Sequence, residues 1–152
     1  MQIHTGDILT VTSGIIVQQV NAQGVMASGV AKAIRDKYPI VFEEYSRYVG
    51  PAYQQKENGR GLLGDIIVTA VTQDLLVVSI IGQQFFGRDG KRYTSYDALD
   101  IGFKEVATLV DELELNVEVH HPLLGAGLGG GDWQIIEAII KSHLPGTHLW
   151  VM

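Results

Sequence analysis

Apolar residues along the chain follow two spacings, one typical of strands and one typical of helices. Short runs rich in β-branched residues predict six strands, over residues 2–4, 15–20, 62–72, 75–81, 117–121 and 148–151. Apolar positions three and four residues apart predict four helices, over residues 30–38, 41–49, 95–113 and 133–143. Because the two kinds of element alternate, we expect an α/β sandwich with helices on both faces of a mostly parallel sheet.

Proline, glycine and polar residues mark the predicted ends of these elements. Pro39 ends the first helix and the Gly-Pro pair at 50–51 ends the second, because proline cannot continue a helix. The polar residues 53–60 are then expected to form a surface loop. Asp132 is a good N-cap residue for the fourth helix.

Composition limits the class of protein. A chain of 152 residues is expected to form a single domain, residues 1–152, with a hydrophobic core. A formal charge of −6 argues against non-specific binding to nucleic acid or to membranes. The absence of cysteine excludes disulfides and thiolate chemistry. No secretory signal and no membrane-spanning run is visible, so we expect a cytoplasmic protein.

The stretch from Leu123 to Trp133 is the most unusual part of the sequence. Its five glycines are too many for a packed element, because glycine loses backbone entropy and has no side chain to bury. A glycine-rich loop between a strand and a helix can aim backbone N–H groups and the positive end of the helix dipole at an anion. The stretch therefore predicts a phosphate or diphosphate site.

Two common phosphate loops do not explain this stretch. The glycines at 125, 127 and 130 match the dinucleotide fingerprint, which requires an acidic residue at the end of the next strand. The last predicted strand, residues 148–151, has no carboxylate. No Gly-Lys-Ser or Gly-Lys-Thr is present either, so the sequence favours neither a Rossmann dehydrogenase nor a P-loop protein.

Three stretches, in this order, resemble the macrodomain family. They are residues 6–9 (Gly-Asp-Ile-Leu), 20–31 (Val-Asn-Ala-Gln-Gly-Val-Met-Ala-Ser-Gly-Val-Ala) and 122–133 (Pro-Leu-Leu-Gly-Ala-Gly-Leu-Gly-Gly-Gly-Asp-Trp). The last three residues are similar to the branch that holds ADP-ribose-1″-phosphate processing proteins of phages and bacteria and ADP-ribosyl hydrolases. The resemblance implies a three-layer α/β/α sandwich with a mixed, mostly parallel central sheet. It also implies ADP-ribose as the ligand, and we expect no cofactor and no metal.

The resemblance assigns parts of the ligand to parts of the chain. Asp7 and the Ile8 N–H would contact adenine, Asn21 would contact the distal ribose, and residues 24–30 and 125–131 would enclose the diphosphate. The implied ligand contacts are Asp7, Ile8, Asn21, Gly24, Val25, Met26, Ser28, Gly29, Val30, Leu124, Gly125, Ala126, Gly127, Leu128, Gly129 and Gly130. Structural interpretations stay open beside these roles, because Asp7 would also cap a turn and Asn21 would also form an Asx turn.

Few residues are candidates for acid–base chemistry. Those near enough to the expected ligand are Asn21, Ser28, His121 and Asp132. His120 and His121 would act as acid or base, or bind a metal, although no third ligand is evident. The side chains that would close over the ligand, or only pin their segment to the core, are Phe85, Phe86, Tyr93 and Tyr96.

Three departures from the similar enzymes bear on catalysis. Hydrolases of this branch carry a lysine after the fourth strand, where this chain has Gly-Gln-Gln at 82–84. Some also carry an aspartate inside the glycine loop, at about Gly129. The yeast-type phosphatase of the branch has a histidine in the second strand, where this chain has Gln18. The general base is therefore not identified.

Three hypotheses follow for the function. The leading one is a hydrolase of ADP-ribose derivatives that removes the phosphate of ADP-ribose-1″-phosphate. The main alternative is a non-catalytic module that binds free ADP-ribose or ADP-ribosylated macromolecules. The third is a hydrolase that removes ADP-ribose from protein or nucleic acid without the lysine. A membrane is not expected as a partner, and nucleic acid is expected only as a modified substrate.

Overall fold

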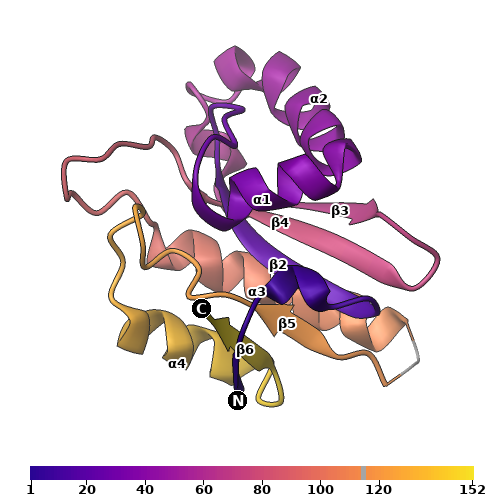
Figure 1. Cartoon of the computed structure of the whole chain (residues 1–152). Coiled ribbons are helices and arrows are strands. Elements are labelled where there is room, and N and C mark those ends of the chain that lie inside the picture. The colour runs from indigo at the N-terminus through magenta and orange to yellow at the C-terminus, as the bar shows by residue number, and fades with distance from the viewer. Residues whose placement is uncertain (114–115) are drawn as a thin grey trace.

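The computed structural model describes residues 1–113 and 116–152. Over these residues, six strands form one mixed sheet in the order β1–β6–β5–β2–β4–β3 (Figure 1). They are β1 (Gln2–Thr5), β2 (Gly14–Asn21), β3 (Ile66–Ala70), β4 (Leu75–Gln83), β5 (Val119–His121) and β6 (His148–Val151). Only the pair β3–β4 is antiparallel in this sheet. The carboxyl ends of the other five strands therefore share one edge.

Helices cover both faces of the sheet, as the sequence predicts. The described helices are α1 (Gly29–Lys37), α2 (Pro39–Gln55), α3 (Tyr96–Glu112) and α4 (Trp133–His143), with short 3-10 turns η1 (Ile8–Thr10) and η2 (Arg60–Leu62). One buried cluster joins the sheet to α1 and α2, and a second joins it to α3 and α4. The predicted three-layer α/β/α sandwich is thus confirmed. None of the described helices is long and apolar enough to cross a membrane.

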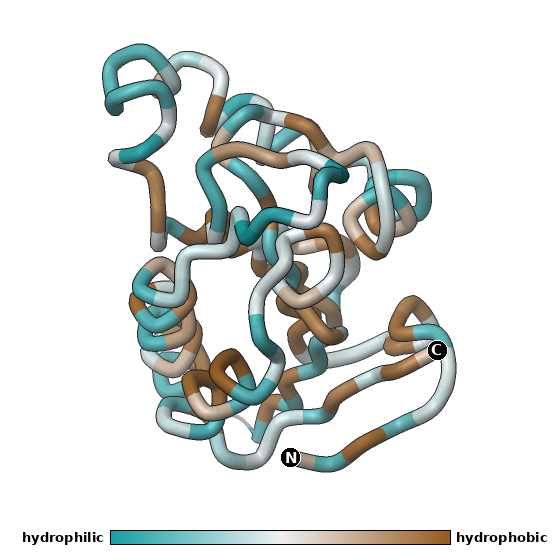
Figure 2. The backbone as a smooth tube through the Cα atoms, turned by 90° about the vertical axis from the view of Figure 1, so that its left-hand side faces the viewer, coloured by the Kyte–Doolittle hydropathy of each residue, from teal (hydrophilic) through white to brown (hydrophobic). Residues whose placement is uncertain are grey.

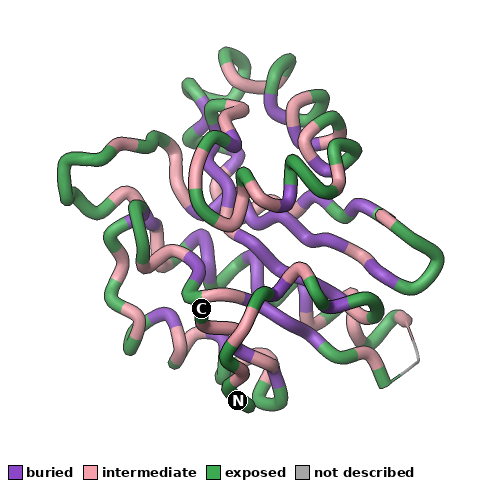
Figure 3. Tube along the Cα trace, in the orientation of Figure 1, coloured by how far each residue is buried: buried purple, intermediate pink, exposed green. Residues whose placement is uncertain are grey.

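Strand β2 contributes to both cores, because successive side chains of a strand point to opposite faces. Ile16 and Val20 belong to the cluster under α1 and α2, whereas Ile15 and Val17 belong to the cluster under α3 and α4. This explains why the consecutive residues 15–17 are all apolar. The central strands β2, β4 and β5 are buried in the middle of the molecule (Figure 3), and the helices alternate between hydrophobic and hydrophilic residues along their turns (Figure 2).

The predicted end of the second helix at 50–51 is wrong. Helix α2 continues through this proline to Gln55, so the first residues of the expected 53–60 loop are helical. A proline removes only one backbone donor, and the turn that follows is intact, with the Lys56 N–H donating to the Ala52 carbonyl at 2.9 Å. Ala52 also packs against the core under this helix. Tertiary packing therefore carries the helix past the proline.

The predicted strand over 62–72 begins too early. Strand β3 starts at Ile66, whereas Leu62 lies in η2 and is buried in the core. Gly64 has φ +92°, a left-handed conformation that a regular strand does not accommodate. The apolar character of Leu62 thus reflects packing rather than strand pairing.

Candidate functional site

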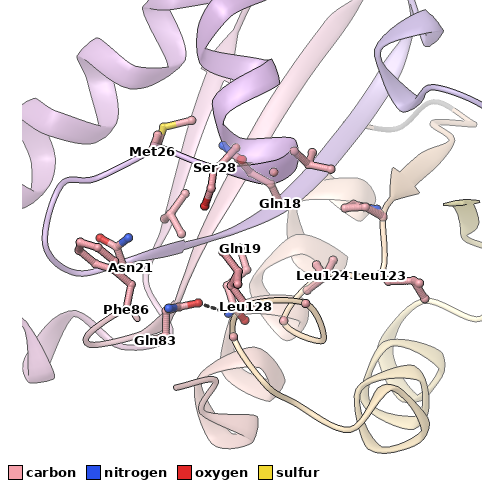
Figure 4. Close-up of a pocket in the computed structure, with 18 of the residues that line it drawn as sticks. Gln18, Gln19, Asn21, Met26, Ser28, Gln83, Phe86, Leu123, Leu124 and Leu128 are labelled. Atoms are coloured by element: carbon pink, nitrogen blue, oxygen red, sulfur yellow. Dashed lines mark hydrogen bonds between the residues drawn. The ribbon is translucent and has the colours of Figure 1, made fainter. Parts of the chain in front are cut away.

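A cleft of about 560 Å³ opens at the carboxyl ends of the parallel strands. Its wall includes Asn21 at the end of β2, Gln83 at the end of β4, Pro122 just after β5 and Trp150 in β6. Ligands of open α/β sheets bind at this edge. The loops that follow β2 and β5, which the sequence singles out, frame the cleft (Figure 4).

The loop between β2 and α1 is held by two side chains. The Asn21 Nδ2 donates to the Val25 carbonyl at 2.8 Å, and the Asn21 Oδ1 accepts from the Gln23 N–H at 2.9 Å. The Tyr45 hydroxyl of α2 donates to the Asn21 carbonyl at 2.6 Å and accepts from the Gly24 N–H at 3.0 Å. Burial raises the pKa of Tyr45, so it remains a donor. The Asx-turn interpretation of Asn21 is correct, although Asn21 also lines the cleft.

The start of α1 faces the cleft with an unusual N-cap. Ser28 has the extended backbone of an N-cap, yet its side chain makes no capping hydrogen bond to the described first turn. By contrast, Ser95 and Asp132 accept hydrogen bonds from their own helices, at 3.1 Å and 2.9 Å. Residues 28–31 line the cleft. The helix thus presents its N–H groups and the positive end of its dipole to the cleft.

The glycine loop after β5 is fixed from outside the cleft. The Thr94 hydroxyl donates to the Gly125 carbonyl at 2.7 Å, and the Tyr93 and Thr94 N–H groups donate to the Gly129 carbonyl at 2.7 and 3.0 Å. A Cβ atom at Gly129 would collide with Thr94, whereas one at Gly127 would meet nothing within 4 Å. Glycine is therefore needed at 129 for packing, and at 127 it leaves space open.

An amide network joins this loop to the sheet. The Gln19 Nε2 donates to the Gln83 Oε1 at 2.6 Å (Figure 4). It also donates to the Thr94 hydroxyl at 3.0 Å. Gln83 lies in the segment where similar hydrolases carry a lysine. A glutamine side chain does not ionise and supplies no amine nucleophile.

The cleft holds little charge. Arg88 is the one ionisable side chain among the described residues that line it. None of the described residues that line the cleft therefore has an imidazole, amine or carboxylate side chain. The cleft offers hydrogen bonds, an open helix terminus and a single cation.

Most of the predicted ligand contacts lie in this cleft, but five do not. The predicted contacts that line it are Asn21, Val25, Met26, Ser28, Gly29, Val30, Leu124, Gly125, Gly127, Leu128 and Gly129. Gly24, Ala126 and Gly130 belong to the same loops without lining it. Asp7 is exposed and caps η1, accepting from the Leu9 N–H at 2.9 Å, and Ile8 is buried in the core. An adenine contact at these two residues stays a prediction.

The two acid–base candidates after β5 lie outside the cleft. His121 is fully buried, and its ring nitrogens lie 2.9 Å from the Thr147 hydroxyl and 3.0 Å from the Pro122 carbonyl. Burial lowers the pKa of His121 to about 4, so the ring is neutral. The Asp132 carboxylate caps α4, as predicted. This geometry argues against proton transfer by either residue.

The histidine pair does not converge on one site. His120 packs beside His148, and its Nδ1 accepts from the Trp150 Nε1 at 2.9 Å. Burial lowers the pKa of His120 as well. Within residues 1–113 and 116–152, no three histidine, aspartate or glutamate side chains are grouped to hold a metal ion.

The four aromatic candidates differ in whether they line the cleft. Phe86 lines the mouth of the cleft with 49% of its surface exposed, whereas Phe85 does not line it. Tyr93 donates to Asp89, and the Tyr96 hydroxyl accepts from the Asp132 N–H at 3.0 Å. Of these four side chains, only Phe86 is placed to contact a ligand in the described cleft.

Sequence reasoning gave no binding role to several residues that line the cleft, among them Gln18 and Arg88. Gln18 interrupts an apolar strand and is 2% exposed, and Arg88 lies in the segment after β4. The available signal for Gln18 was the polar pair at 18–19 inside a strand that is otherwise apolar. For Arg88 there was no local signal, because only the fold brings its segment to the cleft.

Fold and site together define a class of protein, the α/β sandwiches whose cleft at the strand ends is framed by two glycine-containing loops. The sequence model of the Macro domain matches residues 17–140, and the chain belongs to the macrodomain family. Two curated relatives are named DNA ADP-ribosyl glycohydrolase, from Mycobacterium bovis and Mycobacterium tuberculosis. Each is 26% identical over 141 residues, which cover 91% of this chain but 37% of the relative. The chain thus spans little more than a third of their length.

Solved structures show the same fold. A protein of unknown function from Bacteroides thetaiotaomicron has a TM-score of 0.82 and 28% identity, covering 99% of this chain and 96% of that one. The macrodomain of Mycobacterium tuberculosis DarG has a TM-score of 0.74 and 22% identity, over 99% and 95%. Thermosipho africanus DarTG in complex with ADP-ribose has a TM-score of 0.74 and 16% identity, over 99% of this chain and 42% of that one.

Proposed function

We propose that this chain binds ADP-ribose in the cleft between residues 24–30 and 123–131. The observation that carries the proposal is that the uncapped start of α1 and the glycine loop open onto the same cleft. Backbone N–H groups at a helix terminus suit a diphosphate, and Arg88 adds a cation at the wall. The mycobacterial relatives, named for an ADP-ribosyl substrate, and a similar fold solved with ADP-ribose support this ligand.

Substitution of Gly127 tests the proposal by calorimetric titration with ADP-ribose. An added side chain at 127 meets no neighbour, and this glycine does not have a positive φ, so Gly127→Glu is expected to fold normally. Its carboxylate would repel the diphosphate, and we expect ADP-ribose affinity to fall at least about a hundredfold, to the limit of detection. Gly146→Glu is the matched control, since its position is also open but lies in the turn before β6. Wild-type affinity in Gly127→Glu would show that this loop does not enclose the diphosphate.

Hydrolysis of an ADP-ribose derivative is the second candidate, with ADP-ribose-1″-phosphate as the substrate to test first. The free side chain of Ser28, beside an open helix terminus, favours a site that holds a phosphate group. The absence of an imidazole, amine or carboxylate side chain among the described lining residues favours binding without turnover. The experiment measures phosphate release by the wild type and by Gly127→Glu. Faster release by the wild type would establish the phosphatase, and equal rates would leave a binding module.

Removal of ADP-ribose from protein or nucleic acid is tested in the same design. ADP-ribosylated DNA and an ADP-ribosylated protein replace the phosphate ester, and release of ADP-ribose is followed by mass spectrometry. The names of the mycobacterial relatives make DNA the first choice.

A further inference from the structure

A row of aromatic rings crosses β1, β6 and β5, three neighbouring strands of the sheet (Figure 1). The His4 ring stacks on Trp150 with 4.6 Å between the ring centroids, and the His120 ring stacks on His148 at 4.7 Å. The row lies on the face of the sheet that α1 and α2 cover, because Trp150 packs against the core under these helices. Three imidazoles thus lie together beside one indole.

Trp150 connects this row to the cleft. The residue lines the cleft, and its indole Nε1 donates to the His120 Nδ1 at 2.9 Å. Gly6, in the turn after β1, packs against the same indole, since a Cβ atom at this glycine would lie 3.7 Å from the ring. The orientation of the indole therefore affects both the cleft and the turn that follows β1.

The hydrogen bond between these two rings requires a neutral imidazole. An indole nitrogen only donates, and a histidine nitrogen accepts only while it carries no proton. His120 therefore has its proton on Nε2, which lies 3.5 Å from the Glu118 carboxylate. Protonation would add a hydrogen to Nδ1, and two donors would then face each other across 2.9 Å. The imidazole and the indole would have to separate.

The neighbours of His120 determine the pH at which this happens. Among the described residues, the titratable or charged side chains that face it are Glu118 just before β5, His148 of β6 and His4 of β1. Burial lowers the pKa of His120, as does His148, and the opposing effect of Glu118 is smaller. The ring is therefore neutral at pH 7.5 and gains its proton below about pH 6.5.

We propose that His120 is a positioning residue that holds the Trp150 indole in the wall of the cleft and thereby makes ligand binding depend on pH. The inference rests on the proposed function, since ADP-ribose is the ligand whose binding is regulated. At neutral pH the indole is fixed and the cleft keeps its shape. On acidification the indole loses its acceptor, the wall is disturbed and the affinity falls. The diphosphate of ADP-ribose is bonded at both ends, so it lacks the ionisation near pH 6 of a terminal phosphate.

Calorimetric titration of the whole chain with ADP-ribose at pH 7.5 and at pH 5 tests the proposal. We expect the affinity of the wild type to fall about threefold to tenfold at pH 5, as for the loss of one hydrogen bond. His120→Asn cannot titrate, and its amide oxygen can replace Nδ1 as the acceptor, so its affinity is expected to be equal at both pH values. His143→Gln is the matched control: this imidazole ends α4, does not line the cleft, and its loss is expected to leave the pH dependence unchanged.

The NMR signal of the Trp150 indole N–H gives a readout that a merely structural histidine would not move. Trp150→Phe identifies the signal, because the chain has two tryptophans. In the ligand-free wild type, the signal is expected to shift with pH below about 6.5, and in His120→Asn it is expected to stay fixed. This measurement on the wild type decides the question even if His120→Asn does not fold.

Three results would overturn the role of His120. They are an indole signal that does not titrate, a wild-type pH dependence that persists in His120→Asn, and a wild-type affinity that is unchanged or higher at pH 5. A higher affinity would mean that the charge of the imidazolium attracts the diphosphate. No binding of ADP-ribose at pH 7.5 would instead overturn the proposed function, and the NMR titration would still test the bond between His120 and Trp150.

Discussion

At the scale of single residues, N-cap side chains distinguish a structural helix start from one that is open to a ligand. The side chains of Asp132 and Ser95 cap their own helices by accepting a backbone hydrogen bond, whereas the side chain of Ser28 makes no such bond. The residue type alone predicts an N-cap at all three positions. The difference depends on the orientation of each side chain, which the fold determines.

Alanine substitution separates the two kinds of cap. Ser28→Ala is expected to change the free energy of unfolding by less than about 0.5 kcal/mol, because no capping bond is lost. Asp132→Ala is expected to cost about 1 kcal/mol. Urea unfolding measures both. With ADP-ribose, Ser28→Ala is expected to lose about threefold to tenfold in affinity. A loss of stability equal to that of Asp132→Ala would show that Ser28 is an ordinary cap.

At the scale of elements, a helix outside the cleft holds the first loop in place. Tyr45 of α2 is buried and bonds to both ends of the turn that begins at Asn21. The sequence predicts Tyr45 as part of the apolar face of this helix, but not the hydrogen bonds that its hydroxyl makes. In the sequence, Tyr45 is 21 positions away from Gly24 and 24 positions away from Asn21. Helix packing thereby sets the shape of a binding loop.

Removing one hydroxyl tests this coupling. Tyr45→Phe leaves the ring in the core but removes the hydroxyl that accepts from the Gly24 N–H. Because this N–H then lacks its partner, we expect a loss of about 1–3 kcal/mol in the free energy of unfolding. ADP-ribose affinity is expected to fall as well, because the loop loses its support. Tyr48→Phe is the control: it lies on the same helix, and its hydroxyl donates to Asp65 at the surface. A Tyr45→Phe variant with wild-type stability and affinity would contradict the role of this hydroxyl.

At the scale of the whole molecule, the sheet order determines which strand ends meet. β5 lies between β2 and β6, so the two glycine-containing loops stand opposite each other although about 100 residues separate them. The same order buries His121 between the sheet and α3, with its ring against Phe103. A residue that the sequence proposes for catalysis thus becomes part of the core.

Burial of this histidine makes the stability of the fold depend on pH. The pKa of His121 is about 4 in the folded protein, against about 6.5 for an unperturbed histidine. The unfolded chain therefore binds the proton first as the pH falls, and stability that is present above pH 6.5 is lost on the way to pH 4. We expect His121 to account for a loss of about 2 kcal/mol between pH 7.5 and pH 5.

Urea unfolding at these two pH values measures the loss. His121→Gln cannot titrate, so its stability is expected to depend less on pH, by about 2 kcal/mol over the same interval. The variant is expected to be less stable than the wild type at pH 7.5, since the substitution disturbs the packing. The test therefore compares how steeply the free energy of unfolding depends on pH in the two proteins, not its value at one pH. An unchanged slope would show that other groups cause the acid sensitivity.

The sequence by itself determined the elements, the layers and the two loops, because each of these follows from local spacing, glycine content or a short motif. Only the tertiary structure decided which side chains reach the cleft. Gln18 and Ser79 are 61 residues apart in the chain, and Thr94 meets Gly125 across 31. Such contacts depend on strand register and on helix packing, which arise when distant segments bury their apolar faces together. The glycine loop can therefore be identified from the sequence alone, whereas the side chains that hold it, Gln19 and Thr94, are known only from the folded chain.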